Sequence, residues 1–173
     1  MTNPKLKQTS LMNLATFEQG LITIQDPRKQ AFLGVLFWTG CRLSEALALH
    51  RKDLAWKDNR IWIDLYHLKH TKQTDPFPAP RKPYLDQLEA SHLADRLFTF
   101  SPRTAQYTVS KAFKDHYPHF FRMNRITQLL VDGATIPEIQ SVYGLTIGAI
   151  NRYLARVSVK RVDQILQKEA LRQ

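Results

Sequence analysis

Residues 39–49 read TGCRLSEALAL, a tight turn followed by an apolar helical run. Gly40 suits the turn, and Arg42 stands directly after it at the head of the expected helix. At such a point, helix N–H groups and a guanidinium fork are able to converge on one phosphate. The alternative is that Arg42 only pairs with Glu45 on the surface. This stretch taken by itself leaves both interpretations open.

The whole chain has the composition of a small basic domain. Its 173 residues contain 25 Lys and Arg against 15 Asp and Glu, which gives a net charge of +10. A surplus of that size typically marks a polyanion partner, either nucleic acid or an acidic membrane surface. The 43% hydrophobic and 23% charged fractions exclude a disordered chain. The length predicts one compact domain.

Cysteine content and hydropathy predict a cytoplasmic location. Cys41 is the sole cysteine, so no internal disulfide forms and a reducing compartment is expected. No stretch approaches the roughly 20 apolar residues that span a bilayer. The N-terminus has lysines but no apolar run of a signal peptide behind them. Two HxxH pairs, His67/His70 and His116/His119, lack the companion ligands that would favour a metal site.

Capping signals and apolar spacing predict a mostly helical chain. Thr16 is the expected N-cap of a first helix, and Asp26-Pro27 begins a second helix that ends at Gly40. The later expected helices are a short one with Leu85, Leu88 and Leu93, then residues 107–116, Pro118 to Gly133, Thr135 to Gly144, 147–156 and 162–171.

One strand-rich segment interrupts the helices. Ile61, Ile63 and Leu65 alternate with outward-facing residues after a turn at Asp58-Asn59, which is the period of a half-buried strand. A polar, proline-punctuated hairpin is expected from Lys69 to Pro80. The predicted fold class is therefore mainly α with a small antiparallel β-sheet (α+β).

Three ordered motifs resemble the signature boxes of the tyrosine recombinase, or phage integrase, family. Residues 39–49 resemble its T-G-x-R-x-S-E box, residues 119–122 (HFFR) its H-x-x-R box, and residues 133–140 (GATIPEIQ) its G-A-x-x-x-x-I-Q segment. The resemblance covers about residues 14–157 and implies the catalytic-domain fold of that family. It also implies a site-specific DNA recombinase or integrase that cleaves and rejoins strands through a covalent 3′-phosphotyrosine.

Such chemistry needs a nucleophile, cationic clamps on the phosphate oxygens and an acid for the leaving 5′-oxygen, and it needs no metal, cofactor or ATP. The resemblance implies Tyr153 as the nucleophile, Arg42 and Arg122 as the clamps, and His119 as an acid/base. Tyr143 is the nearest competitor for the role of nucleophile. It precedes the turn at Gly144, however, whereas the family tyrosine follows such a turn.

The family also places a lysine on its β-hairpin to protonate the leaving oxygen. Lys72 is the preferred counterpart, because Thr71-Lys72 followed by Pro80 resembles the T-K…P spacing of many relatives. Lys69 is the alternative.

Some positions depart from the family pattern. Leu145 replaces the usual histidine or tryptophan donor, and the interval from it to Tyr153 is shorter than the commonest spacing. Met123-Asn124 replaces the usual H-T after the H-x-x-R box. We interpret the chain as a divergent, active enzyme. Two alternatives are a catalytically weak DNA-binding architectural or regulatory relative, and a type IB topoisomerase-like relaxing enzyme.

The expected organisation is a flexible N-terminal extension (1–13), a catalytic domain (14–157) and a C-terminal helix (158–173). The family commonly docks that helix into a neighbouring protomer, although its narrow apolar stripe also suits packing on its own domain. Residues before Leu14 are too few for the family's N-terminal domain, so an excised domain or a minimal recombinase is expected. The expected partners are double-stranded DNA and further copies of the chain, from dimer to tetramer on DNA, with no membrane.

Overall fold

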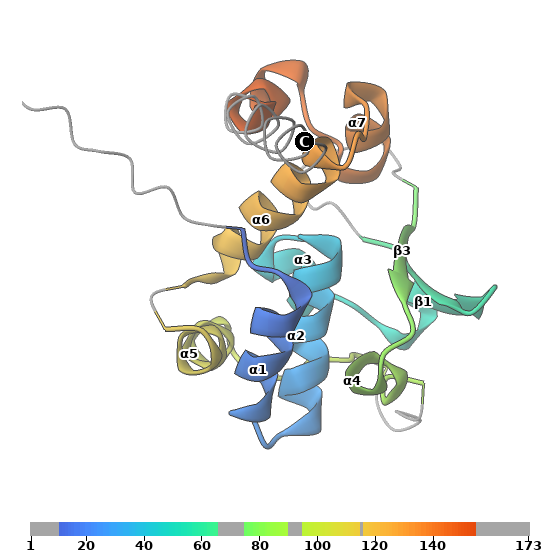
Figure 1. Cartoon of the computed structure of the whole chain (residues 1–173). Helices are drawn as coiled ribbons and strands as arrows, with labels where there is room; N and C mark the ends of the chain where they lie inside the picture. Colours follow the sequence, from blue (N-terminus) through green and yellow to red (C-terminus); the bar gives the residue numbers. More distant parts are fainter. Residues whose placement is uncertain (1–10, 66–74, 90–94, 115, 155–173) are drawn as a thin grey trace, which may run out of the picture.

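The computed structural model describes residues 11–65, 75–89, 95–114 and 116–154. In these ranges most helices lie on one side of a three-stranded antiparallel sheet, whose strand order is β1-β2-β3 (Figure 1). This arrangement confirms the predicted fold class. The elements are α1 (Leu14–Ile22), α2 (Pro27–Thr39), α3 (Leu43–Leu47), a 3-10 turn (Arg51–Asp53), β1 (Leu54–Lys57), β2 (Arg60–Ile63), β3 (Phe77–Pro80), α4 (Pro83–Asp86), α5 (Pro102–Ala112), α6 (Pro118–Val131), α7 (Ile136–Tyr143) and a helical stretch at 147–154.

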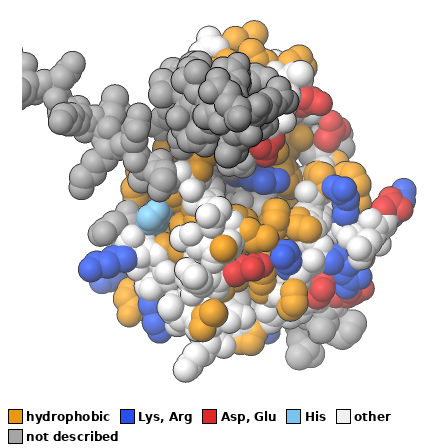
Figure 2. Space-filling model, in the orientation of Figure 1, with side chains coloured by type: hydrophobic (Ala, Val, Ile, Leu, Met, Phe, Trp, Pro, Cys, Tyr) orange, Lys and Arg blue, Asp and Glu red, His pale blue; other side chains and the backbone are white. Residues whose placement is uncertain are grey.

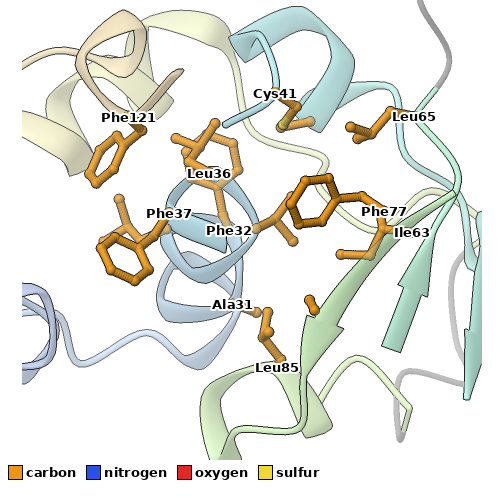
Figure 3. Close-up of a cluster of buried hydrophobic side chains, with 14 of the residues drawn as sticks. Ala31, Phe32, Leu36, Phe37, Cys41, Ile63, Leu65, Phe77, Leu85 and Phe121 are labelled. Carbon is orange, nitrogen blue, oxygen red and sulfur yellow. The ribbon is translucent and has the colours of Figure 1, made fainter. Parts of the chain in front are cut away.

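Helix α2 forms the centre of the fold. Asp26 caps it by accepting hydrogen bonds from the backbone N–H of Arg28 at 2.9 Å and of Lys29 at 3.4 Å. Gly40 ends it in the left-handed conformation, at φ 61°. Both ends agree with the prediction. Residues 31–37 are all buried, because α1, α6 and the sheet cover different sides of this helix (Figures 1 and 3).

The predicted N-cap of α1 is wrong. The helix begins at Leu14, and the Asn13 side chain accepts a hydrogen bond from the backbone N–H of Thr16 at 2.9 Å. Both residue types cap helices well, so packing of the incoming chain decides between them. The buried Met12 pairs both backbone groups with the Asn124 side chain of α6, at 2.8 and 3.2 Å. The chain is therefore attached to α6 directly before α1 begins.

The sheet follows the predicted alternation. Asp58 and Asn59 form the turn with φ values of 53° and 56°, and Ile61 and Ile63 point into the core with no exposed surface. Strand β1 was not predicted, because its four residues (LAWK) are too short to show a period. Strand β3 lies at the sheet edge, where prolines are tolerated. Residues 69–74 of the expected hairpin lie outside the described residues.

The later helices agree with the prediction in α6, in α7 and in the helical stretch 147–154, and differ in α4 and α5. Helix α5 begins at Pro102 behind a Ser101 cap rather than at Tyr107, because its first turns are polar and carry no apolar period. Helix α4 is a single turn, Pro83–Asp86. Leu93 and the expected C-terminal helix at 162–171 lie outside the described residues.

An aromatic cluster joins four helices. The Phe17 ring of α1 stacks on the ring of Phe37 in α2, with 4.0 Å between the ring centres. It also stacks on Phe113, directly after α5, with 5.5 Å between the ring centres. Phe121 of α6 meets Phe113 edge-on at 5.4 Å. Figure 3 shows Phe37 and Phe121 on one side of α2, with Phe77 and Ile63 of the sheet on the other. The cluster holds α6 in a defined position against α2.

Charges of both signs are spread over the visible surface. On the face in Figure 2, the Lys and Arg side chains and the Asp and Glu side chains of the described residues lie scattered among one another. Within the described ranges no helix has the length and apolar character needed to cross a bilayer.

Candidate active site

The turn at residues 39–42 is held by its own side chains and by later parts of the chain. The Thr39 hydroxyl donates to the Val35 carbonyl at 2.7 Å and accepts from the Cys41 N–H at 3.1 Å. Gly40 adopts φ 61°, a conformation that glycine reaches without steric cost. The turn therefore delivers Arg42 to the N-cap position of α3.

Replacing Gly40 with alanine is expected to lower the free energy of unfolding by about 2–4 kcal/mol. An added Cβ would lie 2.8 Å from the Cβ of Arg125 and would have to adopt the left-handed conformation. Gly148→Ala is the matched control, since its Cβ would meet open space. Urea titrations of both variants check this, and equal losses of stability in the two would contradict it.

Arg42 pairs with Glu45, but not on the surface. Glu45 is only 1% exposed, and its carboxylate accepts from the Arg42 backbone N–H and from Arg42 Nη1, each at 2.6 Å. The Arg42 side chain remains 29% exposed. The pairing proposed as the alternative therefore exists, and it orients the Arg42 guanidinium.

Arg122 lies inside the protein. Its side chain is 2% exposed, Nη1 donates to the Gly40 carbonyl at 3.1 Å, and Glu45 Oε2 lies 3.8 Å away. Nη2 has no hydrogen-bond partner among the described residues. One buried carboxylate therefore serves two guanidinium groups, and a donor is left over for an anion.

A pocket of about 580 Å³ opens where the start of α3, the outer face of α5 and the start of α6 meet. Three of the predicted site residues, Arg42, His119 and Arg122, line it together. Its full lining is Cys41, Arg42, Leu43, Arg103, Gln106, Tyr107, Ser110, His116, Tyr117, Pro118, His119 and Arg122. The surplus of cationic and hydrogen-bond donors makes it suitable for a phosphate.

The two tyrosines occupy different environments. Tyr143 has no exposed surface, and its hydroxyl donates to the Thr39 carbonyl at 2.6 Å. Burial raises the pKa of this phenol well above its ordinary value, and Tyr153 adds to the rise while Arg125 and Arg122 oppose it. Tyr153 is half-buried on the helical stretch 147–154 and packs against the core. Neither tyrosine lines the pocket.

Other candidate groups are less suited to catalysis or cannot be located. Burial raises the pKa of the Cys41 thiol to about 12, so this pocket residue is no thiolate nucleophile. His116 Nδ1 lies 2.9 Å from the Lys114 carbonyl and its ring contacts Phe120. The described part of the chain contains no group of three or more metal-ligating side chains. Lys69 and Lys72 lie outside the described residues, as do His67 and His70.

Sequence reasoning missed the contribution of α5 to the pocket. Its lining residues are Arg103, Gln106, Tyr107 and Ser110. They are spaced i, i+3, i+4 and i+7, so they share one helical face. Tyr107 is 67% exposed, and Tyr117, which also lines the pocket, is 63% exposed. A search for polar periodicity, rather than apolar periodicity, would have identified this face.

Neither a protein-family model nor a curated protein matches the chain. Solved structures do match. XerA recombinase has a TM-score of 0.69 at 19% identity, covering 91% of this chain and 64% of its own. XerH recombinase, in a pre-cleavage complex with its difH substrate, has a TM-score of 0.68 at 17% identity. The match covers 83% of this chain and 49% of the XerH chain. The catalytic domain of bacteriophage HP1 integrase has a TM-score of 0.56 at 18% identity. The match covers 84% of this chain and 87% of the HP1 domain.

The protein has the tyrosine recombinase catalytic-domain fold. It spans most of the isolated HP1 catalytic domain but only 64% and 49% of the two Xer recombinases. Within this fold, the departures from the family boxes have structural partners. Leu145 is half-buried, and its carbonyl accepts from the Gln140 side chain at 3.1 Å. Asn124 binds the backbone of Met12 instead of supplying a group to the pocket.

Proposed function

We propose that this chain is the catalytic domain of a site-specific DNA recombinase that acts through a 3′-phosphotyrosine. The observation that carries the proposal is the arginine pair on Glu45. Arg42 and Arg122 share one buried carboxylate at one pocket, and Arg122 Nη2 has no partner among the described residues. Two planar guanidinium groups suit the non-bridging oxygens of a phosphodiester, whose added charge in the transition state they stabilise.

In the proposed reaction, the Tyr153 phenolic oxygen attacks the phosphorus and the bond to the 5′-oxygen breaks. His119 accepts the phenolic proton, and Lys72, or alternatively Lys69, donates a proton to the leaving 5′-oxygen. The 3′-phosphate is then joined to Tyr153. A DNA 5′-hydroxyl reverses these steps and regenerates the phenol, so no external energy source is consumed.

Tyr153 needs to move for this reaction. It lies near Tyr143, whose ring contacts Arg122, and it does not line the pocket. We infer that binding of DNA turns the helical stretch 147–154 so that the phenol faces the phosphate. Catalytic contacts that tighten only in the substrate complex are common in enzymes.

The α5 face would bind the DNA beside the reacting phosphate. Arg103→Ala is expected to weaken DNA binding and to lower the slope of log K against log salt by about 1, because one phosphate contact is lost. Arg28→Ala removes another exposed charge, at the start of α2, and serves as the control. Fluorescence anisotropy at several salt concentrations measures both, and equal slopes for the two variants would contradict the assignment.

The decisive experiment uses a library of nicked duplexes with a randomised central segment, so that the protein itself selects its site. The nick is placed so that cleavage releases a short fragment that diffuses away. Protein-linked DNA is recovered under denaturing conditions and sequenced, and the linked tryptic peptide is identified by mass. We expect enrichment of one sequence and linkage to the peptide of residues 153–156, which follows Arg152.

The other outcomes distinguish the alternatives. Adducts without sequence enrichment, together with relaxation of supercoiled plasmid, would indicate the topoisomerase-like enzyme. Selective binding without any adduct would indicate a DNA-binding relative. Linkage to a peptide that lacks Tyr153 would show that the nucleophile is wrongly assigned.

A further inference from the structure

Tyr143 has no task in the proposed chemistry, yet it contacts the parts of the site that must act together. Its hydroxyl donates to the Thr39 carbonyl at 2.6 Å, and Arg122 Nη1 donates to the next carbonyl, that of Gly40, at 3.1 Å. The Arg122 Cζ lies 5.1 Å from the centre of the Tyr143 ring. One buried side chain therefore contacts both Arg122 and the turn that carries Arg42.

Tyr143 also stands next to the segment that leads to Tyr153. It is the last residue of α7, and Gly144 follows in the left-handed conformation before the helical stretch 147–154. The hydroxyl thus bridges this segment to a turn 104 residues earlier in the chain. Burial keeps the phenol protonated by raising its pKa, so the hydroxyl remains a donor across the ordinary pH range.

Arg125 packs against the same turn, at Gly40. Its Cβ fills the space that a side chain at Gly40 would need. Its guanidinium carbon lies 5.6 Å from the ring centres of Trp38 and of Phe77. Arg125 therefore packs closely against Gly40 in the turn whose Thr39 carbonyl accepts from Tyr143.

We propose that Tyr143 is a positioning residue: its bond to the Thr39 carbonyl sets the placement of the Arg42 and Arg122 guanidinium groups relative to Tyr153. The inference rests on the proposed function, because its effect is measured on the covalent step. Removal of the hydroxyl would leave the Thr39 carbonyl unpaired and would free the turn from α7.

The test compares Tyr143→Phe with Tyr84→Phe. Tyr84 is also buried, at 8% exposure, and its hydroxyl accepts a hydrogen bond from Trp38 Nε1 at 2.9 Å, away from the pocket. Each variant loses the phenolic hydroxyl of a buried tyrosine together with its hydrogen bond. The measurements are the melting temperature, the DNA dissociation constant, and the single-turnover rate of adduct formation at saturating protein on the selected site.

We expect Tyr143→Phe to slow adduct formation by about tenfold or more while the dissociation constant changes by less than about twofold. Tyr84→Phe should lower the melting temperature to a similar degree and leave the rate within about twofold of wild type. An unchanged rate in Tyr143→Phe, or equal slowing in both variants, would overturn the proposal.

A double mutant adds a measurement that general destabilisation would not change. If Tyr143 acts through Arg122, Tyr143→Phe costs less rate in an Arg122→Lys background than in wild type. Fully additive losses would overturn the proposal. A wild-type protein that forms no adduct would instead remove the proposed function and this inference with it, an outcome distinct from the three above.

Discussion

Tyr153→Phe is expected to form no covalent DNA adduct, while folding and DNA affinity stay close to those of wild type. The change deletes the single oxygen that would bond to phosphorus and keeps the ring, which packs against the core. Two groups among the described residues are poor replacements, because the Cys41 thiol is held protonated and Tyr143 is fully buried. The measurement is the fraction of selected DNA that migrates with the protein on a denaturing gel.

Two comparisons make this result specific. Tyr143→Phe removes the competing phenol and should still give an adduct, at a reduced rate. Tyr107→Phe removes an exposed hydroxyl at the pocket rim and should give an adduct whose yield tracks DNA binding alone. An adduct of wild-type yield from Tyr153→Phe would refute the assignment of the nucleophile.

Glu45→Gln is expected to lower the free energy of unfolding by about 3–5 kcal/mol, the usual cost of breaking a buried ion pair. Glu45 is 1% exposed and faces Arg42 Nη1 at 2.6 Å and Arg122 Nη1 at 3.8 Å. A neutral amide leaves the charge of the buried Arg122 without its carboxylate. The same change weakens the cap of α3, because the Arg42 N–H loses a charged acceptor.

The control for this prediction is Glu18→Gln. Glu18 pairs with Lys82 at 3.1 Å, but its side chain is 43% exposed, so we expect a loss of only about 0–1 kcal/mol. Chemical denaturation of both variants provides the comparison. The prediction fails if the two variants lose the same free energy of unfolding, because the two carboxylates differ in their burial.

Local signals predicted the parts of the fold that depend on a few adjacent residues. Helix α2 begins at Asp26-Pro27 and ends at Gly40, and α7 begins after Thr135 and ends at Gly144. These ends are predictable because the unpaired backbone groups of a helix end find their partners within one turn. The same reasoning failed at Thr16, where Asn13 is an equally good cap. It also failed at β1, whose strand pairing rather than its four-residue pattern defines it.

The sequence by itself determined the chemical groups of the candidate site and their order along the chain. Only the tertiary structure decided how those groups are arranged. Glu45 is a buried counterion rather than a surface partner, and the polar face of α5 forms part of the pocket. Arg122 reaches Gly40 across 82 residues and Tyr143 reaches Thr39 across 104. The physical reason is that burial and hydrogen bonding between distant segments come from the packing of the whole domain, which no local pattern of residues records.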